Sequence, residues 1–498
     1  LEARYTIVSI GPQRQILEDL VVGDPNDPDL VVKRATIDIG YGFSAPTISA
    51  VKVQGARLSG SVREGKLSFG ALDSLIFEGA DETASGLPSF DLELVDAGAV
   101  FETDFGDIAV TIEGAGQLDN GFSGAIAAVA PGLEWDGCTA LTSTAFGAVT
   151  TKDGEPAFEG PLRLRDASCQ GAVIGSVDLA TRARASSDLS TFEGALDIAS
   201  SGLGFDENRV DDVSGTASFS YRPEMFVLDH DLAFARAQTG FVSANRLGAK
   251  GVFRASDSFA NTSWNAQLSG EGLATGPSAQ ATLENAKEAG AQTLVEPLLA
   301  KLERALSGVG KSATLSGDVS WRRNGTGQSL VIPEARVAGE GGGTILALSR
   351  FNWSAPDGEE SGLGEVAGAF FGGGPSLPQI NGRMTQDDRG LLALRLSMEE
   401  YREGENAVAV PGLSIRQLAS ERFRFAGQAK LSGDIPGGSM NGVSVPLNGD
   451  FSSRSGFVMG RTCEGISFDR ITLYPLALEK NEVEVCPGDG GAILRYAD

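Results

Sequence analysis

The chain has 498 residues, including 66 glycines and 20 prolines, and its formal net charge is −26. Charged residues make up 21% and apolar residues 41%, which excludes an intrinsically disordered chain, and the glycines have no Gly-X-Y period, which excludes collagen. A surface this acidic repels phosphate groups, so we expect no nucleic-acid partner and no electrostatic docking to anionic lipid.

The residues that common enzymes need are scarce. His230 is the one histidine, and its neighbours Asp229 and Asp231 would point to the opposite face of a strand. Residues 305–312 resemble a phosphate-binding loop, but they follow a predicted helix and precede a strand, which reverses the order that phosphate binding requires. The acidic run 24–29 is typical of a turn. The sequence therefore predicts no enzyme, no cofactor and no metal site.

Alternation of apolar and polar residues predicts half-buried strands across residues 1–275. Ile37, Ile39 and Tyr41 share one face, and the pairs Asn120-Gly121 and Asp153-Gly154 are typical of hairpin turns. The same pattern predicts that the following residues lie on an apolar face: Phe90, Leu92, Leu94, Ile108, Val110, Ile112, Leu196, Ile198, Phe219, Trp264 and Leu268.

The four cysteines form two pairs that are local in sequence. Cys138 with Cys169, and Cys463 with Cys486, would each close a loop of two or three strands. The first interpretation is two disulfides in an oxidising compartment, and the alternative is four buried thiols.

One segment departs from the strand pattern. Leucines and Val295 recur at three- and four-residue steps across residues 278–307, which predicts an amphipathic helix within a helical segment at 276–308. Gly290 and Pro297 are expected break or kink points, and Gly308 is an expected stop. The helix either packs on the sheet or forms a plug or lid over the apolar face.

A second β region is predicted over residues 309–498. Its candidate apolar-face residues are Leu315, Val319, Trp321, Leu394, Phe423 and Phe425. The pentad Ala-x-Leu-Ser-Gly occurs at 56–60, 266–270, 313–317 and 429–433. In each pentad, leucine would face one side while glycine lets the sheet bend.

These patterns predict a mainly β chain: a long, curled antiparallel sheet, or repeating β-groove, with one helical segment. An apolar face of that size usually marks a binding surface, and acyl chains can cover it because each buried methylene contributes about 0.8 kcal/mol. The alternatives are a structural or adhesive β-solenoid and tandem β-sandwich ligand-binding modules. A second sheet over the apolar face would favour the sandwich.

Two segments of the sequence resemble a known protein family. Residues 15–30 lead into the strand 32–41, and Cys486-Pro-Gly-Asp-Gly-Gly491 follows the strand 471–478 and completes the second cysteine pair. Together with the pentads, they resemble the YdbH-type branch of the AsmA-like proteins of Gram-negative bacteria.

The resemblance implies a periplasmic protein that conducts phospholipids from the inner to the outer membrane and supports outer-membrane lipid homeostasis. It also implies an N-terminal inner-membrane anchor and a small outer-membrane lipoprotein as partner. This sequence has no apolar run of about 18–20 residues and does not begin with Met, so we expect a segment of a longer, anchored protein.

Overall fold

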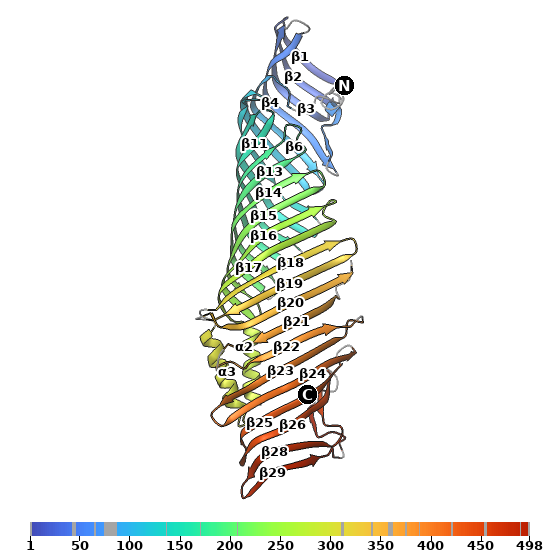
Figure 1. The fold of residues 1–498 in the computed structure, drawn as a ribbon. Helices are drawn as coiled ribbons and strands as arrows, with labels where there is room; N and C mark the ends of the chain where they lie inside the picture. Colours follow the sequence, from blue (N-terminus) through green and yellow to red (C-terminus); the bar gives the residue numbers. More distant parts are fainter. Residues whose placement is uncertain are drawn as a thin grey trace. The chain divides into compact units, whose positions relative to one another are not determined.

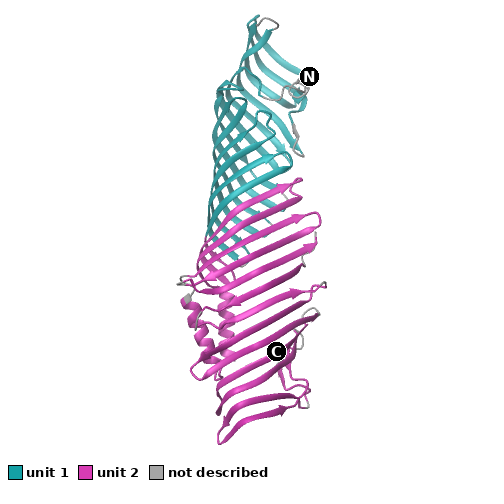
Figure 2. Cartoon of the chain, viewed as in Figure 1, with its two compact units in different colours: residues 1–234 teal, residues 235–498 magenta. Residues whose placement is uncertain are grey.

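The computed structural model forms two compact units, residues 1–234 and 235–498 (Figure 2). It describes residues 2–41, 46–63, 66–73, 87–135, 137–169, 171–206, 208–309, 313–339, 342–356, 362–373, 376–387, 389–419, 422–452, 456–488 and 490–496. The predicted division into two β-groove regions on either side of residues 276–308 stays a prediction.

Within unit 1, the described strands follow one another in a single hydrogen-bonded sheet (Figure 1). Two-residue turns such as Asp153-Gly154, with φ values of 54° and 82°, match the twist of the paired strands. The strands are β1 (Ala3–Ile10), β2 (Arg14–Asp24), β3 (Asp27–Tyr41), β4 (Pro46–Arg63), β5 (Lys66–Ser68), β6 (Asp91–Thr103), β7 (Gly106–Gln117), β8 (Ser123–Ala130), β9 (Leu133–Trp135), β10 (Cys138–Lys152), β11 (Glu155–Cys169), β12 (Ala172–Ala185), β13 (Phe192–Phe205) and β14 (Asn208–Arg222); β15 (Met225–Gln238) crosses the unit boundary, and a 3-10 turn, η1, spans Gly70–Leu72.

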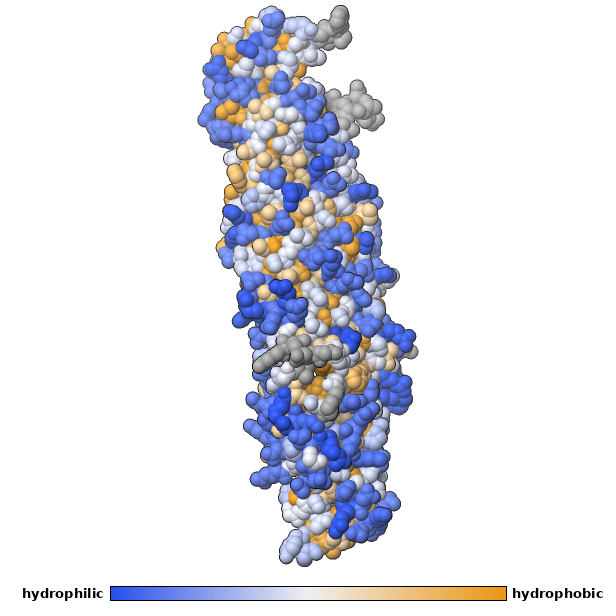
Figure 3. Space-filling view, turned by 60° about the vertical axis from the view of Figure 1, so that its left-hand side comes forward, coloured by the Kyte–Doolittle hydropathy of each residue, from blue (hydrophilic) through white to orange (hydrophobic). Residues whose placement is uncertain are grey.

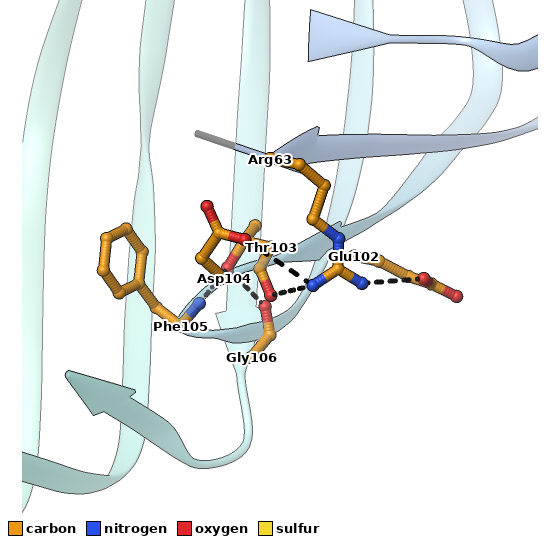
Figure 4. Close-up of polar contacts among 6 residues, drawn as sticks. All are labelled: Arg63, Glu102, Thr103, Asp104, Phe105 and Gly106. Atoms are coloured by element: carbon orange, nitrogen blue, oxygen red, sulfur yellow. Dashed lines mark hydrogen bonds and ion pairs between the residues drawn. The ribbon is translucent and has the colours of Figure 1, made fainter. Parts of the chain in front are cut away.

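One pairing departs from the predicted antiparallel order, because β4 and β6 are parallel. The chain between them contains β5 and η1, so a crossover replaces a hairpin. Arg63, the last residue of β4, lies 3.2 Å from Glu102 and 3.7 Å from Asp104 at the end of β6 (Figure 4). Its guanidinium also donates to the Thr103 carbonyl, so the side chain links the ends of the two parallel strands.

Unit 2 repeats the antiparallel arrangement, with neighbours in chain order from β16 to β26. Its strands are β16 (Val242–Ser256), β17 (Asn261–Thr275), β18 (Thr314–Asn324), β19 (Gly327–Ala338), β20 (Thr344–Pro356), β21 (Leu363–Phe371), β22 (Ile380–Gln386), β23 (Leu392–Glu403), β24 (Asn406–Ala419), β25 (Arg422–Ile435), β26 (Gly438–Ser452), β27 (Gly456–Met459), β28 (Glu464–Leu473), β29 (Leu476–Val485) and β30 (Leu494–Tyr496).

Two helices, not one, occupy the predicted helical segment: α2 (Pro277–Ala289) and α3 (Glu296–Val309). The chain leaves the helix at Gly290, as expected, but Pro297 lies in the first turn of α3, where its missing N–H costs nothing. α3 contacts β17, β23 and β24. The prediction of a mainly β chain with a helical segment is confirmed, with corrections to helix number and to the β4–β6 pairing.

Candidate functional site

An apolar row crosses unit 1 from strand to strand. Directly paired residues share a face of the sheet, so the register itself defines the row. From β2 to β14 its members are Val22, Leu30, Leu58, Ala99, Val110, Ala128, Ala145, Leu162, Leu179, Ile198 and Gly215. No polar side chain interrupts this succession of eleven paired residues.

A second row lies beside the first. Its members are Leu17, Ala35, Val53, Leu94, Gly114, Gly124, Val149, Phe158, Ala183, Gly194 and Phe219. Leu30, Val53 and Leu94 pack around one buried cluster, which places the two rows on the same side of β3, β4 and β6. We call the side that carries these rows the apolar face of unit 1.

Side chains on the apolar face are half-buried, and their neighbours are exposed. On β7, Val110 and Ile112 are half-buried whereas Thr111 and Glu113 are exposed. Among the described residues, no large side chain is less than 2% exposed. The side chains of the sheet therefore cover one another sideways, and they leave apolar area open above them.

The opposite face of unit 1 carries charge. Arg163 pairs with Asp178 at 3.3 Å between β11 and β12, and Arg182 pairs with Asp197 at 3.5 Å between β12 and β13. These side chains are solvent-exposed, and exposed ion pairs contribute little to stability, about 0–1 kcal/mol. Their effect is to keep this face in water; Figure 3 shows hydrophilic and apolar patches side by side on the molecular surface.

Unit 2 has its own central row, which consists of leucine, alanine and glycine. From β16 to β26 its members are Ala249, Leu268, Gly317, Ala335, Leu348, Ala369, Gly382, Leu396, Leu413, Gly427 and Leu447. We call the side that carries them the apolar face of unit 2.

The pentads at 266–270 and 313–317 pair with each other in this sheet. Leu268 lies opposite Gly317, and Gly270 lies opposite Leu315. A Cβ atom at Gly270 would lie 3.0 Å from the Cβ of Leu315 and 3.0 Å from Leu247. Glycine thus makes room for a leucine on the neighbouring strand, which gives the pentad a packing role.

A third set of residues forms a flanking row that lies two residues along each strand from the central row. It begins with Leu247, Gly270, Leu315, Val337, Leu346 and Phe371. Leu302, Ala305 and Leu306 of α3 pack into the same cluster as Leu247, Leu315 and Phe371. α3 therefore lies on the apolar face of unit 2 and covers one side of it.

Charged groups fasten α3 to β23. Arg304 donates to Glu403 at 3.0 Å, and Lys301 Nζ lies 3.6 Å from the same carboxylate and 4.9 Å from the centre of the Tyr401 ring. The Arg304 hydrogen bond, with the positive charge of Lys301, lowers the pKa of Glu403 below its ordinary value. Burial raises the pKa of Tyr401, which keeps its hydroxyl protonated.

The structure places the predicted groove residues along these faces. Val110 and Ile198 lie in the first row of unit 1, Leu94 and Phe219 in the second, Leu268 in the central row of unit 2 and Leu315 in its flanking row. Further direct pairs join Leu92 with Val51, Ile108 with Phe101, Ile112 with Ile126, Leu196 with Ala217, Leu394 with Ile415 and Phe425 with Ile415.

Most predicted groove residues are half-buried, including Ile37, Ile39, Phe90, Trp264, Trp321 and Phe423. Tyr41 is 60% exposed, and Val319 is only 7% exposed. Sequence reasoning missed Leu162, Leu179 and Leu413, although each lies two residues from another apolar residue that gave the same signal. Their role in contacting a ligand stays a prediction.

Each unit contains one disulfide. Cys138 and Cys169 join the ends of β10 and β11, and Cys463 and Cys486 join the chain beside β28 and β29. In both cases the linked strands are already hydrogen-bonded neighbours, so the covalent bond fixes the end of an existing ladder.

The described residues contain no group of three or more His, Cys, Asp and Glu that could hold a metal ion. His230 is 9% exposed within β15. Residues 310–312 of the loop-like segment 305–312 lie outside the described residues.

Comparison with protein families gives one decisive match: a family model described as YdbH-like, intermembrane phospholipid transport protein YdbH, matches residues 1–480. The chain belongs to the YdbH-like family. No curated protein sequence matches it. The family's named activity is intermembrane phospholipid transport, and lipid-transport families are generally non-enzymatic.

An intermembrane location agrees with the oxidising compartment that two disulfides need. In the part of the chain that the structure describes, no helix has both the length and the apolar character to cross a bilayer.

Proposed function

We propose that the apolar faces form a periplasm-spanning groove that holds phospholipid acyl chains and conducts lipids between the inner and outer membranes. The observation that carries the proposal is the unbroken apolar row through each unit, eleven strands long in both cases. In the full-length protein, we further propose an inner-membrane anchor before this segment and a small outer-membrane lipoprotein as partner.

Hydrophobic transfer suits a conduit because it has no preferred direction along the row. Each methylene that leaves water contributes about 0.8 kcal/mol, wherever on the face it lies. Replacing one leucine contact by the next therefore changes the free energy of the bound chain little. A lipid can move along such a face without a deep site to hold it.

The proposal predicts that a carboxylate in the row blocks lipid binding. In Val110→Asp and Leu268→Asp, an ionised group would have to lie against acyl chains without a partner, which costs several kcal/mol. We expect loss of co-purified phospholipid, measured by mass spectrometry, and loss of transfer between vesicles.

Neighbouring residues on the same strands provide matched controls. Thr111 and Gln267 are exposed and point to the opposite face. Thr111→Asp and Gln267→Asp should retain lipid, and circular dichroism should show that all four variants fold. If Val110→Asp and Leu268→Asp retain as much lipid as the two control variants, the proposal that lipid binds the apolar faces is wrong.

A further inference from the structure

Three of the four tryptophans of the chain lie in one short row of unit 2. The register pairs Phe253 with Trp264, Trp264 with Trp321, Trp321 with Leu330 and Leu330 with Trp353. Because Trp264 and Leu268 are separated by an even number of residues in a regular ladder, this row shares the apolar face with Leu268. We call these residues the tryptophan row.

The tryptophan row lies near one margin of the apolar face. Trp264 is the fourth residue of β17, and Trp321 and Trp353 each lie three residues before the end of their strands. At about 3.3 Å per residue, the indoles are therefore roughly 10 Å from the strand ends. α3 packs near the other end of β17, against Leu273.

Polarity changes across the tryptophan row. On the same face and nearer the margin, the next paired residues are Ala255, Thr262, Arg323, Gln328 and Ala355. Toward the middle of the face lie Ala266 and Val319, followed by the leucines of the central row. The indoles thus separate a margin that carries a cation and polar side chains from an apolar interior.

The margin also contains a hydroxyl group without a hydrogen-bond partner in the described structure. Thr262 Oγ1 is buried and has no hydrogen-bond partner among the described residues. This hydroxyl therefore keeps unused hydrogen-bonding capacity at the margin. A surface pocket of about 900 Å³ at these strand ends is lined by Gln328 and Ala355 of the margin, and also by Arg322, Ser329 and Ser354, which alternate to the opposite face.

Glycines leave space for the last indole of the row. Trp353 lies opposite Gly364, and a Cβ atom at Gly362 would clash with the indole ring, well inside van der Waals contact. The ring therefore rests against the neighbouring backbone. Tryptophan suits such a boundary because its ring is apolar while its N–H can reach a polar partner.

The dimensions match one phospholipid whose acyl chains run along the strand direction. Trp264 and Leu273 are nine residues apart on β17 (273 − 264), which is roughly 30 Å of strand. One leaflet of a bilayer's hydrocarbon core is about 15 Å thick, half of the usual 30 Å. Acyl chains that start at Trp264 would therefore end near Leu268 and Gly270, before they reach α3.

We propose that the tryptophan row marks the boundary between headgroup and acyl chains for phospholipids bound on the apolar face of unit 2. The headgroup lies over Thr262, Arg323 and Gln328, and the acyl chains extend toward Leu268 and the central row. This inference rests on the proposed function, and it adds an orientation and a polar subsite to it.

Quenching of tryptophan fluorescence by brominated phospholipids tests the orientation. Trp135→Phe leaves Trp264, Trp321 and Trp353 as the only emitters. The protein is loaded with phosphatidylethanolamine that carries bromine either near the carbonyl end or near the methyl end of its chains. We expect the carbonyl-end bromine to cause the greater loss of fluorescence, and greater quenching by the methyl-end bromine would overturn the proposed orientation.

A control tryptophan in the central row distinguishes failure of the headgroup-boundary hypothesis from failure of lipid binding itself. In a variant whose four tryptophans are replaced by phenylalanine, Leu268→Trp should be quenched more by the methyl-end bromine. If this tryptophan is quenched while the tryptophan row is not, lipid binds but the boundary assignment is wrong. If loaded lipid quenches neither, the proposed function also fails.

Discussion

The stretch β7–β14 of unit 1 and the stretch β17–β24 of unit 2 present similar apolar faces, but α3 lies on only the second. In the first stretch, the described buried apolar residues are alanines and Phe122. In the second, Leu273, Ile345 and Tyr401 are buried, as are Leu294 and Leu298 on the helical side. The buried leucines, Ile345 and Tyr401 of the second stretch belong to clusters that α3 joins, whereas Phe122 is the one large apolar side chain buried among the described residues of the first.

The two stretches therefore differ in how much apolar side-chain area stays exposed to water. On β7 and β12, where no described helix covers the sheet, Val110, Ile112 and Leu179 are only half-buried. In unit 2, the protein's own helix removes part of that area from water. In unit 1, the corresponding apolar area stays partly exposed.

The largest expected effect follows from breaking the contact between α3 and the sheet. Leu298 is 4% exposed among Leu294, Tyr401 and neighbouring apolar groups, so Leu298→Ala should lower the free energy of unfolding by about 3 kcal/mol through lost burial and a residual cavity. Chemical denaturation measures this change.

Val110→Ala in unit 1 is the comparison for Leu298→Ala. Because Val110 is half-buried and has no helix over it, its truncation should cost about 1 kcal/mol or less. Equal losses in the two variants would show that α3 does not create a more deeply packed region.

A smaller effect concerns pH. Since the folded protein lowers the pKa of Glu403 below its ordinary value of 4.5, the ionised carboxylate stabilises the docked helix above that value. This contribution is lost as the pH falls from 4.5 through the lowered pKa. The protection of residues 296–309 against hydrogen exchange, relative to the intrinsic rate at each pH, should therefore fall over that acidic range.

Glu403→Gln provides the pH control, because its amide does not titrate. We expect faster exchange of residues 296–309 at neutral pH than in the unsubstituted protein, and little further change in protection on acidification. The same acid dependence in both proteins would assign the effect to another group.

Much of the fold followed from the sequence because period-two alternation and turn chemistry are local. The strand around Val110 and the turn at Asp153-Gly154 could each be recognised from only a few consecutive residues. Gly290 likewise ended a helix where its lack of a side chain suggested a break. The parallel β4–β6 pairing was missed, since a crossover depends on how distant strands dock and not on local pattern.

The face of each strand was harder to predict where the backbone reverses the alternation. Asp19, Gly55 and Asp96 have φ values of 49°, 65° and 53°. Asp19 and Gly55 interrupt pairings that keep the same register on both sides, and Asp96 lies at a register shift between β6 and β7. A residue in this left-handed region shifts the following side chains to the other face. Val53 and Ala56, on either side of Gly55, consequently share one cluster although their spacing is odd.

Photo-crosslinking on opposite faces tests the central claim most directly. A photoreactive amino acid replaces Val110 or Leu268 on the apolar faces, and Thr111 or Gln267 on the exposed faces, in cells that supply radiolabelled phospholipid. We predict crosslinks to phospholipid at Val110 and Leu268, and none above background at Thr111 and Gln267. Crosslinks of equal yield at all four positions, or only at Thr111 and Gln267, would contradict the account.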